Sequence, residues 1–167
     1  MFVRTFYIRI SPSRFRVDSP GIAPGYDDVP AVAIRSEQAG AQIIAAVGRS
    51  AVALQGTPNT RVVHPFTHPR IAVHELLVAS KLMQHAVRQL MQSLKWYQVR
   101  PLVRVVLHPL YPFNGGLTDT EERALAEVAY TCGARLVYFH SGRELLASEL
   151  DTFDFRNARA LHPKVPR

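Results

Sequence analysis

The fold of this chain is decided by LVRVVL at residues 102–107, TDTEERALAEVAYTCG at residues 118–133 and RLVYF at residues 135–139. The first segment is a nearly continuous apolar run, which is typical of a strand buried on both faces. In the second segment, Thr118 followed by Glu121 predicts the start of a helix that ends near Gly133. The third segment predicts another buried strand, so the order strand, helix, strand favours a domain that combines helices with a sheet.

A longer helix precedes this unit. Apolar residues recur at spacings of three and four, which predicts an amphipathic helix of about six turns. They are Val73, Leu76, Leu77, Met83, Val87, Leu90, Met91 and Leu94. After the second buried strand, residues 142–150 predict a third helix, whereas the tail from residue 151 shows no periodicity.

The N-terminal part of the chain favours strands. Residues 2–10 and 13–18 flank Ser11-Pro12, a turn pair, and therefore predict a hairpin. Residues 19–28 contain two Gly and two Pro and predict a loop, and residues 29–35 and 42–47 predict two more strands. The whole pattern predicts one α/β domain over residues 1–150, a mixed sheet with N-terminal antiparallel strands flanked by helices, followed by a C-terminal tail at 151–167.

Length and composition narrow the class of protein. The 167 residues leave room for one compact domain. Twenty Lys and Arg against 13 Asp and Glu give a net charge of +7, but the basic residues are scattered, which is more typical of a soluble protein than of a nucleic-acid site. The single cysteine, Cys132, excludes an internal disulfide, and no signal peptide or membrane span is recognisable. We therefore expect a cytoplasmic protein without a transmembrane segment.

Several short motifs follow one another in a defined order. Val-Ala-Ile at residues 32–34 precedes Ala-Ala-Val-Gly at 45–48 and Gly-Thr-Pro at 56–58, and Thr118–Ala124 precedes Gly-Ala-Arg at 133–135. In order and approximate spacing, these motifs resemble the N-terminal half of the MreB family, the actin-like rod-shape-determining proteins of bacteria. The resemblance covers roughly residues 7–150 and implies a ribonuclease H-like, actin-like ATPase subdomain.

The chain departs from this family at the first phosphate-binding turn. In the family, a D-x-G-T hairpin supplies a carboxylate for the metal and a glycine that lets the backbone approach phosphate. The corresponding stretch here is Arg9-Ile10-Ser11-Pro12-Ser13, so a cation replaces the carboxylate and Pro12 lacks an N–H donor. Because a positive charge cannot hold Mg²⁺, we expect no bound cofactor, no catalytic residue and no ATP turnover.

Glu121 has two interpretations. The resemblance aligns it with the glutamate that positions the attacking water in the family. The residue also completes the capping box Thr118-x-x-Glu121 of the helix that it opens. Because the carboxylate of the phosphate turn is missing, we expect Glu121 to cap the helix.

The spacing of the histidines gives only a weak indication of a metal site. His64, His68 and His74 form the densest set, but prolines beside the first two keep them from sharing a helix face, and no cysteine or carboxylate joins them at ligand spacing. We therefore expect no metal. His108 and His140 end the two buried strands, where side chains often line a site.

Aromatic residues in expected loops are the candidate protein interface. Tyr111 and Phe113 lie in a proline-flanked segment, and Trp96 follows the long helix. Rigid, exposed aromatic residues are typical of protein contacts. Cys132 lies at a helix end, where the helix dipole disfavours a thiolate, so we expect it to be inert.

These observations favour a non-enzymatic actin-like protein, a pseudo-ATPase that acts by protein–protein binding in cell-shape or envelope assembly. The expected partner is a filament-forming actin-like protein or a second copy of the chain. Two alternatives stay open at this point. One is a basic nucleic-acid-binding module on a ribonuclease H-like fold, with strongly salt-dependent binding; the other is a residual nucleotide-binding domain.

Overall fold

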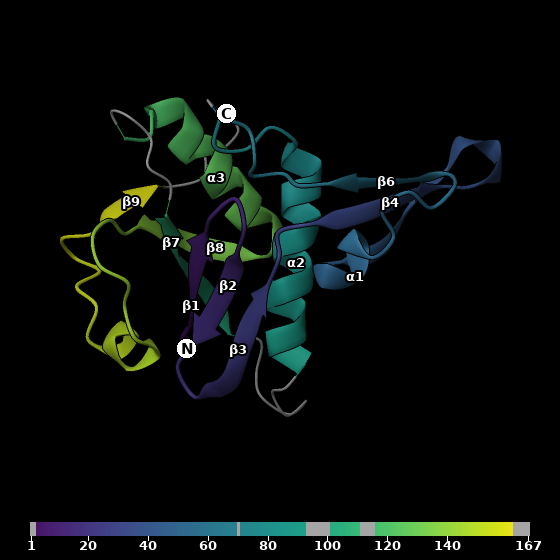
Figure 1. Ribbon diagram of the computed structural model, residues 1–167. Helices are drawn as coiled ribbons and strands as arrows, with labels where there is room; N and C mark the ends of the chain where they lie inside the picture. The colour runs from purple at the N-terminus through teal and green to yellow at the C-terminus, as the bar shows by residue number, and fades with distance from the viewer. Residues whose placement is uncertain (1–2, 70, 93–100, 111–115, 162–167) are drawn as a thin grey trace.

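The computed structural model describes residues 3–69, 71–92, 101–110 and 116–161, and its largest element is a six-stranded mixed sheet in the order β3-β2-β1-β7-β8-β9 (Figure 1). The strands are β1 (Val3–Ile10), β2 (Phe15–Ser19), β3 (Ile22–Asp28), β7 (Leu102–Pro109), β8 (Ala134–Phe139) and β9 (Arg159–Leu161). β1, β7 and β8 are parallel, whereas β2, β3 and β9 run antiparallel to their neighbours. The predicted N-terminal hairpin and mixed sheet are confirmed.

Two helices, α2 (Leu76–Gln92) and α3 (Asp119–Thr131), pack on one face of this sheet. Alternate residues of a strand point to opposite faces, so Phe6, Ile8 and Ile10 of β1 enter the core beneath the helices, while Tyr7 faces the other side. The apolar spacing that predicts the long helix is confirmed over the described part of α2. Leu76 and Leu77 are exceptions, because they are 39% and 80% exposed.

The opposite face of the sheet, which we call the back face, is covered by the chain that follows β8. Leu150 is buried there against Tyr7 and Tyr138, with Phe153 and Phe155 packed beside them. The predicted helix at 142–150 is wrong, because only a short 3-10 helix, η2 (Ala147–Asp151), forms. Hydrogen bonds from this segment to β1 explain the difference, since they tie its backbone and side chains to the sheet before a helix can begin.

Two further elements differ from the sequence-based expectation. Residues 19–28, expected to be a loop, contain strand β3, which pairs with β2 across a tight turn at Gly21. Pro24 has no backbone N–H to donate to a neighbouring strand. It is tolerated because β3 is an edge strand, which pairs with β2 on one side only in the described structure. Residues 159–161 lie beyond the expected boundary at 150 and add β9 to the same sheet.

A second, three-stranded sheet projects from the body beside α2 (Figure 1). We call it the arm; its strands are β4 (Val32–Ser36), β5 (Gln42–Val47) and β6 (Thr60–Val63), in the order β5-β4-β6. A short 3-10 helix, η1 (Gln38–Gly40), links β4 to β5, and the single-turn helix α1 (Arg49–Val52) packs on the arm through buried Ala51. In the described part of the chain, no helix has the length and apolar character needed to cross a membrane.

Candidate functional site

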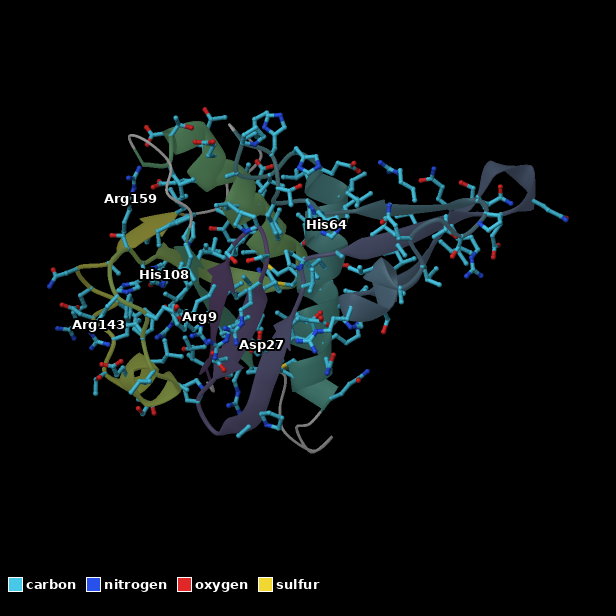
Figure 2. The ribbon with its side chains drawn as sticks, viewed as in Figure 1. Arg9, Asp27, His64, His108, Arg143 and Arg159 are labelled. Atoms are coloured by element: carbon cyan, nitrogen blue, oxygen red, sulfur yellow. The ribbon has the colours of Figure 1, made fainter. Side chains whose placement is uncertain are left out.

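The carboxyl ends of the parallel strands carry polar side chains on the back face. Arg9 of β1 is in register with His108 of β7, so these two residues and Tyr7 share that face. In open α/β sheets this edge is where ligand sites usually lie. We call the polar group at this edge the back-face cluster, and its members are Tyr7, Arg9, Asp18, His108, His140 and Glu144. Figure 2 labels two of them, Arg9 and His108.

Arg9 is the centre of the cluster and is neutralised within it. Its side chain is 6% exposed, and its two terminal nitrogens bind different carboxylates. Nη2 donates to Asp18 of the neighbouring strand, and Nη1 donates to Oε2 of Glu144 at 2.5 Å. This hydrogen bond lowers the pKa of the Glu144 carboxyl, which therefore stays ionised. A buried guanidinium requires such partners, because desolvating an unpaired charge is costly.

A tyrosine and two histidines complete the cluster beside Arg9. The Tyr7 hydroxyl lies 2.5 Å from Nδ1 of His108 and accepts a hydrogen bond from the Leu145 backbone N–H at 3.2 Å. Burial lowers the pKa of His108 to about 4, so the ring is neutral near pH 7 and its Nδ1 can accept a hydrogen bond from the Tyr7 hydroxyl. The ring of His140 stacks edge-on against His108, with 4.7 Å between the centroids. These contacts hold the segment after β8 against the sheet.

The residues at this edge do not fit a magnesium nucleotide. The position that the family resemblance assigns to the metal carboxylate is Arg9, whose guanidinium is already bound to two carboxylates. The β1–β2 turn is closed by its own hydrogen bonds, since Ser11 N donates to the Arg14 carbonyl and Arg14 N donates to Ser11 Oγ, each at 3.0 Å. Among the described residues, no three His, Cys, Asp or Glu side chains are grouped to hold a metal ion.

Glu121 caps α3, as the sequence predicts. Its backbone N–H donates to the Thr118 hydroxyl at 3.3 Å, and its carboxylate accepts from the Thr118 backbone N–H at 2.9 Å. The same carboxylate accepts from the Ala72 N–H at 3.3 Å and thereby links α3 to the segment before α2. These hydrogen bonds lower the pKa of Glu121. Its carboxylate thus accepts from two backbone N–H groups and from the Thr118 hydroxyl.

A hollow of about 310 Å³ lies beside the cluster, at the ends of β7 and β8. Glu122 of α3 and Arg159 of β9 line it, together with Phe139 and His140. Arg159 Nη2 approaches Glu122 Oε2 to 2.9 Å, but the angle is not that of a hydrogen bond, and this buried oxygen has no hydrogen-bond partner in the described part of the structure. Burial raises the pKa of Glu122. The ion pair joins β9 to α3 across the hollow.

The other sequence-derived candidates lie apart from this edge. His64 lies beside α2 and the arm (Figure 2), and the rings of His68 and His74 are 6.0 Å apart without a further ligand-type side chain grouped with them in the described residues. Burial raises the pKa of Cys132 to about 11, in line with the expected inert thiol. Trp96, Tyr111 and Phe113 lie outside the described residues, so the interface assigned to them stays a prediction.

Sequence reasoning found three of the six members of the back-face cluster. His108 and His140 were indicated by their position at strand ends and Arg9 by the family resemblance, whereas Tyr7, Asp18 and Glu144 were missed. Arg9 and Glu144 are 135 residues apart, and nothing in the local pattern around either residue indicates the other. Their meeting depends on the parallel pairing of β1 with β7 and of β7 with β8.

The topology and the edge geometry define an actin-like α/β domain, and comparison with solved structures confirms that fold class. The crystal structure of MreB5 of Spiroplasma citri bound to ADP matches 83% of this chain and 38% of its own, with a TM-score of 0.59 and 20% identity. The AMPPNP complex of the same protein matches 84% of this chain and 39% of its own, with a TM-score of 0.61 and 18% identity. A non-polymerising mutant of MamK bound to AMPPNP matches 83% of this chain and 41% of its own, with a TM-score of 0.59 and 13% identity.

Comparison with curated proteins gives the family. The cell shape-determining protein MreB of Pasteurella multocida is 37% identical to this chain over 115 residues, which are 67% of this chain and 30% of that protein. No protein-family profile matches the chain. The chain is thus a homologue of the MreB family of actin-like proteins, and its extent fits the N-terminal half of that family. It spans less than half the length of each of these relatives.

Proposed function

We propose that this chain is a non-catalytic, cytoplasmic actin-like protein that takes part in cell-shape determination by binding another protein. The observation that carries the proposal is Arg9, which stands where the family resemblance places a metal-binding carboxylate and is bound to Asp18 and Glu144. Support for the cell-shape role comes from the MreB relative, which is described as a cell shape-determining protein.

The electrostatics of the back-face cluster argue against nucleotide binding at this edge. An isolated arginine would attract phosphate, but the carboxylates of Asp18 and Glu144 neutralise Arg9 and would repel the phosphates of ATP. Pro12 and the hydrogen-bonded turn around Ser11 also leave few backbone N–H groups for an anion. The relatives solved with ADP or AMPPNP are therefore expected to differ from this chain in that property.

Nucleic-acid binding has less support than protein binding. Several arginines form ion pairs with carboxylates on the surface, and these pairs lower the charge available for phosphate contacts. They include Arg14 with Asp27, Arg61 with Glu75, Arg143 with Glu149 and Arg159 with Asp119. A continuous basic stripe, which nucleic-acid binding favours, is not evident from these contacts.

The proposal is tested by calorimetric titration with Mg-ATP and Mg-ADP, together with thermal unfolding in each nucleotide. We expect no heat of binding and an unchanged melting temperature, whereas an intact MreB protein under the same conditions serves as the positive control. A nucleotide that binds the folded state must stabilise it, so a clear rise in melting temperature would overturn the proposal.

A binding experiment tests the protein-partner half of the proposal. Crosslinking in cells of the source organism should recover an actin-like or envelope-assembly protein with the wild-type chain. The double variant Tyr111→Ala and Phe113→Ala should lower that recovery if these aromatic residues form the interface, and Leu146→Ala, at an exposed apolar residue of the described structure, is the control. Equal recovery with both variants would remove Tyr111 and Phe113 from the interface.

A further inference from the structure

Arg9 joins three parts of the fold that are distant in the sequence. It lies on β1, its Nη2 donates to Asp18 of β2, and its Nη1 donates at 2.5 Å to Glu144, which follows β8. Two carboxylates thus converge on one buried guanidinium. A single positive charge therefore helps to hold the segment after β8 against the hairpin of β1 and β2.

The cluster uses the charge of Arg9 more than its hydrogen-bonding pattern. A guanidinium commonly binds one carboxylate through two parallel N–H groups, which adds both specificity and energy. Arg14 does so, because its Nε and Nη2 donate to the two oxygens of Asp27 at 2.8 and 2.6 Å. In the cluster, each carboxylate takes only one terminal nitrogen of Arg9, and the buried Nε has no hydrogen-bond partner in the described part of the structure. A positive charge between two carboxylate oxygens is also the arrangement of a metal ion with two such ligands.

We propose that the back-face cluster is a cation site whose permanent occupant is the side chain of Arg9, which takes the place of a divalent metal ion between Asp18 and Glu144. A chain without this side chain should therefore bind a divalent cation between the same two carboxylates. Neither of them stands at the position that the family resemblance assigns to a metal ligand, because that position is Arg9 itself. The inference goes beyond the proposed function, since it concerns how the segment after β8 is fastened to the sheet.

The charge balance of the cluster favours a divalent cation once Arg9 is removed. Arg9 neutralises one of the two carboxylate charges, and Arg16, which approaches Glu144 to 3.9 Å, offsets part of the other. Without Arg9, the two carboxylates repel each other in a partly buried site. A divalent ion carries the two charges that neutralise them. Mg²⁺ is commonly held by one or two carboxylates, because it keeps several of its waters.

Other contacts keep the two carboxylates near each other without the help of Arg9. Asp18 lies on a paired strand, in register with Tyr7 of β1. The backbone next to Glu144 is tied to the same tyrosine, because the Leu145 N–H donates to the Tyr7 hydroxyl at 3.2 Å. The two ligands are therefore expected to stay close together when the side chain between them is shortened.

Thermal unfolding of Arg9→Ala in magnesium chloride or calcium chloride tests the proposal, with potassium chloride of equal ionic strength as the reference. Arg14→Ala is the matched control, because it also frees an aspartate, but one that is exposed and that Arg16 still approaches to 3.5 Å. We expect the melting temperature of Arg9→Ala to rise by about 3–6 °C at a metal concentration about tenfold above the Kd. The wild type and Arg14→Ala should not respond beyond the potassium reference.

Manganese locates the ion by a readout that does not depend on stability. Mn²⁺ is paramagnetic, so in Arg9→Ala it should broaden the backbone amide NMR signals of Asp18 and Glu144 first, and in the wild type it should broaden neither. Arg9→Gln repeats both tests on a neutral side chain of more similar length, in case Arg9→Ala does not fold. The double variant Arg9→Ala and Arg16→Ala repeats them without the arginine that could move toward Glu144.

Stabilisation and broadening that are confined to the chains without Arg9 would support the proposal. The absence of both effects from Arg9→Ala, Arg9→Gln and the double variant would overturn it, and so would equal effects in the wild type or in Arg14→Ala. These experiments contain no nucleotide. Their failure is therefore distinct from failure of the proposed function, which Mg-ATP titration of the wild type tests.

Discussion

The back face of the large sheet and the outer edge of the arm treat their polar groups in opposite ways. On the back face, the two terminal nitrogens of Arg9 bind Asp18 and Glu144, and Tyr7 bonds to both His108 and the Leu145 backbone. At the edge of the arm, β5 pairs with β4 on one side only in the described part of the chain, and its Ile43 and Ile44 side chains are exposed.

The two regions therefore differ in the polar groups that they leave available for contact with another molecule. A polar site whose charges are paired internally has little left for a ligand, since an incoming anion would have to displace carboxylates. An uncharged, apolar edge loses little on contact and gains hydrogen bonds when another strand covers it. In this protein the charges at the carboxyl edge of the large sheet are paired with one another, whereas the outer edge of β5 pairs with no strand of the described structure.

Of the changes considered, removal of Arg9 should lower the stability of the protein most, because it removes both ion pairs of the back-face cluster. Arg9→Ala removes the cation that Asp18 and Glu144 share and leaves only Arg16, 3.9 Å from Glu144, in an ion pair with either carboxylate among the described residues. We expect a loss of about 2–4 kcal/mol in the free energy of unfolding, below the upper range for a fully buried pair because Asp18 and Glu144 are partly exposed. Urea unfolding at pH 7 measures this loss.

Arg14→Ala is the matched control, because Arg14 also pairs with an aspartate but is exposed. A surface ion pair contributes about 0–1 kcal/mol, so this variant should unfold almost like the wild type. If the two variants lost equal stability, the back-face cluster would be no more than an ordinary set of surface pairs.

Acid should weaken the same region through His108. The folded-state pKa of His108 is lowered from 6.5 to about 4, so between these values the unfolded chain binds more protons than the folded one. The stabilisation is complete above the unfolded pKa and is lost as the pH falls toward the folded pKa. One group changes the free energy by at most about 1.4 kcal/mol per pH unit, so we expect a loss of up to about 2–3 kcal/mol between pH 6.5 and 4.5.

His108→Gln isolates that contribution, because glutamine does not titrate. Urea unfolding at intervals from pH 7 to 4.5 should show a shallower pH dependence for this variant. His85, whose pKa is also lowered by burial, supplies part of the remaining slope. Carboxylates with lowered pKa values, such as Glu144, affect stability only at more acidic pH. An unchanged slope in His108→Gln would show that His108 is already open to solvent protons in the folded state.

A pair of glycine variants gives the smallest of these effects, a difference of about 1 kcal/mol. Gly48 has a φ of 71° with a ψ of −144°, a conformation that essentially only glycine adopts, and a Cβ at this position would overlap the Asp28 carboxylate, which accepts from the Val29 and Arg49 backbone N–H groups. Gly56 has a φ of 81°, but an added Cβ would meet no described atom within 4 Å. Both alanine variants should lose about 1–2 kcal/mol because of the positive φ, and Gly48→Ala should lose about 1 kcal/mol more because of its ψ and the contact with Asp28.

Urea unfolding of both glycine variants measures the difference between them. A larger loss in Gly48→Ala would show that the backbone conformation of Gly48 and the close approach of Asp28 together hold the corner between β5 and α1. Equal losses would mean that Asp28 moves aside easily and that the positive φ alone matters at Gly48.

The sequence by itself determined the elements whose signals are local. Apolar spacing located α2, the Thr118–Glu121 capping box located the start of α3, and apolar runs located β7 and β8. Each of these signals depends on residues within a few positions of one another. The order of short motifs also identified the family, because collinear similarity needs no knowledge of contacts.

Only the tertiary structure revealed the back-face cluster, strand β3 and the packing of the segment after β8 on the back face. Glycines and prolines hid β3, which forms because β2 offers it an edge to pair with. The expected helix at 142–150 gave way to contacts with Tyr7 and Arg9, which lie more than 130 residues earlier in the chain. Charge and burial at a site depend on which strands become neighbours, and pairing between distant strands leaves no periodic trace in the sequence. The arginine at position 9 could therefore be read as a loss of the metal ligand, but its carboxylate partners could be found only in the fold.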